Sequence, residues 1–144
     1  MSGTLEEIYP SDFEEGITTL PADGPMSPRY PFTYMELPDT ITTIGDRYFD
    51  RGTDIACNHI FPKNIKSVGC NCFWNESNPT KTRIADFSKA ISVPSIKHIV
   101  DEDGFTNVSF SNYTVIKVPS SLYSTWKATE GWNHEELVSR IVRA

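Results

Sequence analysis

The fold of this chain is decided by the stretch Leu37-Pro-x-x-Ile41-x-x-Ile44-Gly45-x-x-x-Phe49, which recurs 24 residues later as Phe61-Pro-x-x-Ile65-x-x-Val68-Gly69-x-x-x-Phe73. A period of this length is typical of solenoids, in which successive coils of chain stack and bury matching apolar side chains. The sequence therefore predicts that the apolar residues of the two copies form columns, with Ile41 lying on Ile65.

A shorter motif, which occurs four times, marks where the strands of such coils would end. Each copy has a few strand-like residues followed by proline, which has no N–H to donate to a neighbouring strand. We predict a strand at each copy, and we expect Gly45 and Gly69 where the chain turns tightly. The four copies are Met35-Glu-Leu-Pro38, His59-Ile-Phe-Pro62, Ile91-Ser-Val-Pro94 and Ile116-Lys-Val-Pro119.

These residues resemble a known family, the bacterial surface-antigen (BspA-like) leucine-rich repeats. The segment from Ile116-x-Val118-Pro119 through Trp126 and Trp132 to Ile141-Val142 resembles the closing segment that follows such repeats in proteins of Gram-positive bacteria and their phages. The resemblance covers about residues 35–144 and is specific as to fold, and it carries no catalytic residues that could be transferred to this chain. This chain departs from the family in having only about four coils, of uneven length.

We therefore predict a mainly β protein with short helices, an α/β solenoid of leucine-rich-repeat type. Residues 1–34 hold half of the ten prolines and an early acidic cluster, and form either an arm that docks on a partner or a cap for the first coil. Thr18-Thr-Leu-Pro21 is a weak match to the motif of strand-like residues followed by proline, and permits a degenerate first coil there. The coils occupy residues 35–118 and a helical cap occupies residues 119–144.

The cap is expected to contain two helices. Ser120 or Ser121 can cap the first, and Gly131 is expected to end it. Asn133, with Glu136 three residues later, has the spacing of a capping box for the second. The apolar side chains expected to pack are Leu122, Tyr123, Trp126 and Trp132 around the first helix, and Leu137, Val138, Ile141 and Val142 on the second.

Composition narrows the class of protein. The net charge of −6 argues against sequence-independent binding to nucleic acid and against docking on anionic lipid. The N-terminal residues lack the basic and apolar regions of a secretory signal, and three cysteines form no disulfide framework. We expect a protein made in a reducing compartment.

Candidate chemistry is confined to a few side chains. Cys57, His59, Cys70 and Cys72 form a candidate zinc set, although their spacing is shorter than usual, and the alternative is a stacked core cysteine with surface thiols. A cysteine nucleophile would need His59, His98 or His134 as its base. The acidic run at residues 101–104 offers oxygen ligands for Ca²⁺, but without EF-hand spacing a charged turn is the simpler interpretation.

The sequence favours a non-enzymatic structural or interaction module without a cofactor. We predict a small head or tail accessory protein of a phage virion, whose partners are other virion subunits or a host surface component. The alternatives are a bacterial cell-surface adhesin fragment and, from another class, a metal-dependent enzyme using the cysteine and histidine group.

Overall fold

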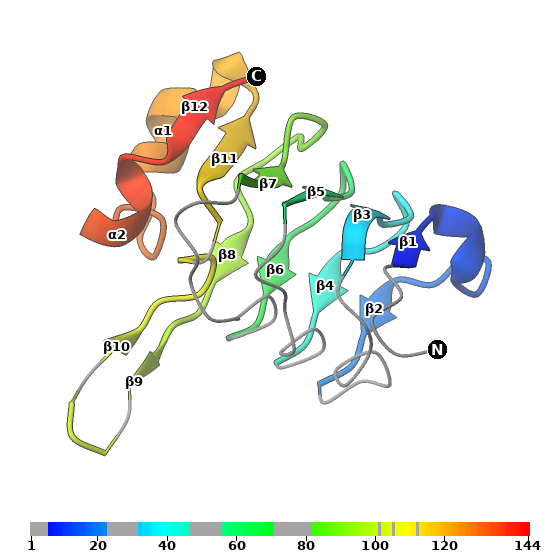
Figure 1. The fold of residues 1–144 in the computed structure, drawn as a ribbon, viewed down its shortest axis with the longest axis horizontal. Helices are drawn as coiled ribbons and strands as arrows, with labels where there is room; N and C mark the ends of the chain where they lie inside the picture. Colours follow the sequence, from blue (N-terminus) through cyan, green and yellow to red (C-terminus); the bar gives the residue numbers. More distant parts are fainter. Residues whose placement is uncertain are drawn as a thin grey trace.

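A computed structural model describes residues 6–22, 32–46, 56–70, 82–100, 102–104, 106–111 and 113–144. These residues form a mainly β structure with two short α-helices, in which parallel strands make up two sheets (Figure 1). The prediction of a mainly β chain with short helices is confirmed.

The chain alternates between the two sheets. Each of the first four passes adds one strand to a six-stranded sheet and then one to a four-stranded sheet. The six-stranded sheet contains, in spatial order, β1 (Glu6–Ile8), β3 (Phe32–Glu36), β5 (Cys57–Ile60), β7 (Arg83–Asp86), β11 (Val115–Val118) and β12 (Ile141–Arg143). The four-stranded sheet contains β2 (Thr19–Leu20), β4 (Thr43–Ile44), β6 (Ser67–Val68) and β8 (Ser95–Ile96).

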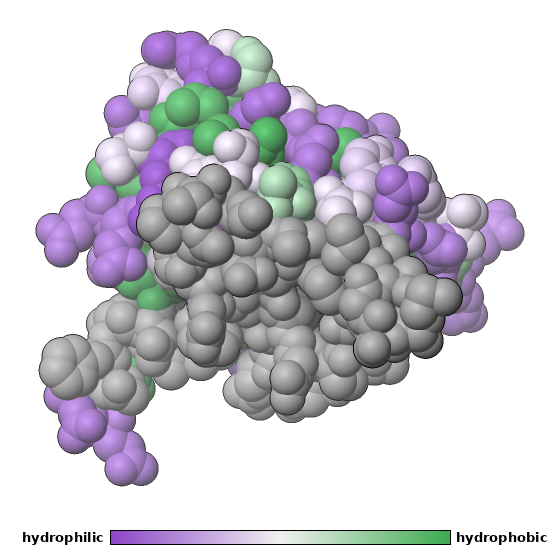
Figure 2. Space-filling view, in the orientation of Figure 1, coloured by the Kyte–Doolittle hydropathy of each residue, from purple (hydrophilic) through white to green (hydrophobic). Residues whose placement is uncertain are grey.

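A third, antiparallel pair stands apart from these sheets. β9 (Ile99–Val100) and β10 (Thr106–Asn107) form a hairpin that projects from the body of the molecule in Figure 1. Glu102 and Asp103 lie exposed near its tip, where Gly104 has a φ of +85° that favours glycine. The tip is hydrophilic in Figure 2.

Strand pairing follows the 24-residue displacement seen in the sequence. β3 pairs with β5 so that Met35 lies beside His59, and β4 pairs with β6 so that Ile44 lies beside Val68. Ile41 and Ile65 are both completely buried between the sheets. Backbone hydrogen bonds between the passes continue past the strands, from Gly45 N to Leu20 O at 2.6 Å and from Gly69 N to Ile44 O at 2.8 Å, each joining residues 25 apart.

The two glycines serve a purpose other than the one expected. Neither adopts the positive φ that a tight turn would require, because the positive values belong to other residues. A Cβ on Gly45 would lie 2.7 Å from Pro21 C, and one on Gly69 would lie 2.8 Å from Gly45 C. Glycine is therefore required because the backbones of successive passes touch at this position.

The prediction of a strand at Ile91 to Val93 is wrong. The third long strand is β7, and Phe87 directly after it stacks on Phe61 with ring centroids 4.2 Å apart. Ile91 is 69% exposed and lies in the connection to β8. Ile96 pairs with Val68, but the interval from Phe87 to Ile96 is two residues longer than the interval from Phe61 to Val68. In this longer connection, residues 91–94 lie outside both sheets.

The N-terminal segment joins both sheets over the residues that the structure describes. β1 pairs with β3, and after the 3₁₀ turn η1 (Pro10–Asp12) the chain enters β2, which pairs with β4. Leu20 takes the place of Ile44 one pass earlier. The weak match to the strand and proline motif at 18–21 thus belongs to the four-stranded sheet, and residues 23–31 lie outside the described part of the chain.

The C-terminal cap packs through a cluster of aromatic rings. Trp126 and Trp132 are completely buried, and each lies within 5.5 Å of Phe87 between ring centroids. The Trp132 indole also donates a hydrogen bond of 2.7 Å to Pro94 O. The expectation that these tryptophans pack the cap is confirmed.

The helices of the cap are shorter than predicted. After the 3₁₀ turn η2 (Ser120–Leu122), helix α1 (Tyr123–Ala128) ends with Thr129 as its C-cap, and Gly131 lies in the following turn with a φ of +92°. Helix α2 (Glu135–Val138) is capped by His134, not by Asn133. Its expected second turn is β12, because Ile141 pairs beside Ile116 at the end of the six-stranded sheet.

The close contact at Gly69 generates a test of this packing. A Cβ at position 69 would collide with the backbone of Gly45 and Asp46, so Gly69→Ala must push the two passes apart. We expect the free energy of unfolding, measured in urea, to fall by about 2 kcal/mol. The matched control is Gly104→Ala, whose Cβ meets nothing within 4 Å and adds only backbone strain, about 1 kcal/mol. An equal or smaller loss for Gly69→Ala would contradict the close stacking.

Candidate functional site

The candidate zinc set does not assemble in the described part of the chain. Cys57 and His59 both point inward from β5 and are buried, whereas Cys70 lies in the turn after β6 and donates its N–H to Asp46. Among the described residues no three histidine, cysteine or acidic side chains are close enough to hold a metal ion. Cys72, the remaining member of the predicted set, lies outside the described residues.

The environment of Cys57 opposes nucleophilic chemistry. Burial raises the pKa of its thiol from the ordinary 9.0 to about 11, against smaller opposing effects of the Arg83 charge and the Ile84 N–H. Because the thiolate is the reactive form, this shift lowers the reactive fraction at neutral pH roughly 100-fold. Cys57 therefore behaves as a small core residue.

His59 is held by a structural partner from a distant segment. Its Nδ1 lies 2.6 Å from the hydroxyl of Tyr113, which is 1% exposed, and the two rings meet edge to face. A buried imidazole needs such a partner because an unsatisfied polar group in the core is costly. The pair fixes the segment before β11 against β5.

The other two candidate bases lie between the hairpin and the cap. His98 Nδ1 accepts from Ser109 N at 3.1 Å and its Nε2 donates to Gly131 O at 2.9 Å, which defines a neutral tautomer. The His134 ring lies 5.6 Å from that of His98 and its Nδ1 accepts the N–H of Glu136. Both rings thus join structural elements. The predicted acidic run lies at the hairpin tip, with Asp101 outside the described residues.

The outward face of the six-stranded sheet carries side chains that are at least partly exposed. They form two rows that follow the strand register across the sheet, and every member of the rows beyond the N-terminal strand is at least partly exposed. The first row contains Glu7, Tyr34, Asn58, Ile84 and Val115, and the second contains Glu36, Ile60, Asp86, Lys117 and Val142.

This outward face changes character along its length. At the β1 end the rings of Tyr9 and Tyr34 lie 5.2 Å apart, and each hydroxyl donates to a carboxylate, Tyr9 to Glu7 and Tyr34 to Glu36. The pKa of Tyr34 is raised to about 12, mainly by the hydrogen bond to Glu36 and to a smaller extent by desolvation. At the centre of the face, the aliphatic side chains Ile60, Ile84 and Val115 alternate with Asn58, Asp86 and Lys117. The face therefore offers an acidic aromatic end and a centre of mixed aliphatic and polar side chains.

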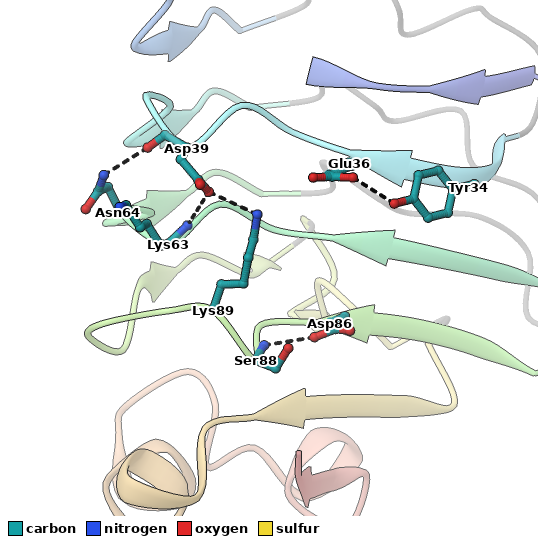
Figure 3. Close-up of polar contacts among 8 residues, drawn as sticks. All are labelled: Tyr34, Glu36, Asp39, Lys63, Asn64, Asp86, Ser88 and Lys89. Carbon is teal, nitrogen blue, oxygen red and sulfur yellow. Dashed lines mark hydrogen bonds and ion pairs between the residues drawn. The ribbon is translucent and has the colours of Figure 1, made fainter. Parts of the chain in front are cut away.

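A ladder of polar contacts holds the turns below this face. Asp39 accepts the Lys63 N–H at 3.1 Å and pairs with Lys89 Nζ at 3.0 Å, while Asn64 donates to its carbonyl (Figure 3). Burial alone would raise the pKa of Asp39, but these two lysines outweigh it and lower that pKa. Three successive passes are thereby joined at one corner.

Comparison of the chain with models of protein families, with curated proteins and with solved structures finds no match. In the described part of the chain, no helix has both the length and the apolar character needed to cross a bilayer.

Sequence reasoning missed two groups. The alternation in Phe32–Glu36 carried a signal for the outward Tyr34 and Glu36, because side chains two apart share a face of a strand. The pairing of His59 with Tyr113 had no local signal, since 54 residues separate them.

The thiol environment of Cys57 can be tested by alkylation. In a chain with Cys70→Ser and Cys72→Ser, only this one of the three cysteines remains. We expect slow reaction with a thiol reagent at neutral pH, a rate that climbs as the pH approaches 11, and fast reaction in urea. A native rate at neutral pH equal to the rate in urea would contradict the burial of this thiol.

The pairing of His59 with Tyr113 can be tested by removing one hydroxyl. We expect Tyr113→Phe to lower the free energy of unfolding by about 1–3 kcal/mol, because a buried hydrogen bond is lost. The matched control is Tyr123→Phe, whose hydroxyl bonds Lys127 nearer the surface and should matter by a few tenths of a kcal/mol. Equal effects in urea titrations would show that the buried pair is not stabilising.

Proposed function

We propose that this chain is a non-enzymatic protein-binding module built as a short solenoid of leucine-rich-repeat type. Support for the solenoid comes from the parallel pairing of strands 24 residues apart and from the columns of buried side chains. The turn ladder at Asp39 adds the repeated polar contacts that successive coils would need.

The observation that carries the binding role is the pair of outward rows on the six-stranded sheet. Parallel strands side by side place residues of equal register next to each other, so the face is continuous from β1 to β12. Ile60, Ile84 and Val115 at its centre are only half-buried, although aliphatic side chains of this size are usually buried. Protein interfaces commonly combine such apolar side chains with polar and charged ones.

The charge of the face selects the kind of partner. Glu7 and Glu36 beside two tyrosine rings favour a cationic side chain at that end, through ion pairing and cation–π attraction. The expected partner is therefore a protein surface with an apolar patch next to a lysine or arginine.

We propose that the partner is another subunit of a phage virion, in its head or tail. The support is the likeness of the closing segment to those of phages and Gram-positive bacteria, together with a face suited to permanent contact. In this role the chain contributes a rigid surface to an assembly and performs no chemistry.

Incorporation into particles tests this function. We expect mass spectrometry of purified phage particles to detect the chain, and Ile84→Glu to reduce its amount per particle at least about tenfold, because a charge is introduced into an apolar contact. The control is Thr125→Glu, an exposed position on α1, which should assemble normally. Recovery of the chain only with the bacterial cell wall would reject the virion role and favour an adhesin.

A further inference from the structure

The six-stranded sheet ends in two strands that have a neighbour on one side only, among the described residues. These are β1 and β12, which lie at opposite ends of the sheet in Figure 1. An unpaired strand edge presents N–H and C=O groups to any strand that approaches it. Because all six strands are parallel, the chain direction at one end matches that at the other.

The two end strands also match in register. Successive pairings place Ile8 beside Met35, then His59, Ala85, Ile116 and finally Ile141, all on the buried side of the sheet. The residues that follow Ile8 and Ile141 are Tyr9 and Val142. If β12 of one molecule lay beside β1 of the next in this register, the buried column of one molecule would continue into that of its neighbour without interruption.

Exposure singles out the same two positions. Tyr9 is 42% exposed and Val142 is 39% exposed, and they are two of the four large apolar side chains that the described residues leave exposed. The other two, Ile91 and Val100, lie near the hairpin. Tyr9 of one copy would cover Val142 of its neighbour, as cross-strand aromatic and β-branched pairs do within a sheet.

Charge decides which ends can meet. Residues 6–22 carry Glu6, Glu7, Asp12, Glu14 and Glu15 and no lysine or arginine. At the other end, Arg143 of β12 lies 4.0 Å from the ring centroid of Tyr123 and Lys127 lies 4.8 Å from it, so two cations share one ring. Arg140 precedes β12, and Glu130 follows helix α1. Glu135 and Glu136 open α2 beside His134, which faces His98 near the hairpin.

We propose that the partner seated on the β1 end is the β12 end of a second copy of this chain, so that the molecules associate head to tail. Contact between two β1 ends would bring Glu7 against its own copy, and contact between two β12 ends would do the same for Arg143. The remaining combination is a heterologous contact, which closes into a ring or extends as a filament. This proposal rests on the sheet ends and is independent of the virion role.

Sedimentation velocity of the full chain at several concentrations tests the association. We expect the wild-type chain to form larger species as concentration rises, and more weakly at high salt because the end charges are screened. Tyr9→Lys places a cation against the basic end, and Val142→Glu places an anion against the acidic end. Each single variant should raise the dissociation constant at least about tenfold.

Mixing the two variants separates head-to-tail contact from any symmetric contact. The Tyr9→Lys chain keeps an intact β12 end and the Val142→Glu chain keeps an intact β1 end, so an equimolar mixture should regain association that neither variant shows alone. Both positions are exposed, and circular dichroism should show unchanged folding. A monomeric wild-type chain, unaffected single variants or a mixture that stays monomeric would each overturn the proposal.

Discussion

The structure depends on one constraint, which is that successive passes of the backbone lie in direct contact at equivalent positions. The hydrogen bonds from Gly45 N to Leu20 O and from Gly69 N to Ile44 O both join residues one pass apart. A side chain at either glycine would collide with the backbone of the preceding pass. The apolar residues before each glycine are then carried into the core at equivalent positions, and Ile41 and Ile65 are both completely buried.

Polar groups in this fold serve mainly to tie the passes together. Asp39 connects three turns at the surface, and the pairing of His59 with Tyr113 connects β5 to the segment before β11 in the interior. Cys57 is buried with a raised thiol pKa, which lowers the reactivity of this thiol at neutral pH. In the part of the chain that the structure describes, the surfaces that we propose for binding are the outward face of the six-stranded sheet and its two ends.

The face and the ends suit different contacts. The face combines half-buried aliphatic residues at its centre with acidic groups beside tyrosine rings at the β1 end, and an unlike protein surface can cover it laterally. The ends are narrow and match each other in register and in charge. We propose that a chain with both features occupies one position in a larger assembly and also connects to its own copies.

The sequence by itself determined the class of structure and the register of its best-matched passes. Leu37 to Gly45 and Phe61 to Gly69 keep equal spacing, so their strands pair with the displacement that the sequence shows. The tertiary structure decided where that spacing breaks. Two additional residues after Phe87 moved Ile91 to the surface, and pairing with β11 drew Ile141 into a strand although its local pattern suited a helix. Both outcomes depend on contacts between distant segments, which local periodicity does not encode.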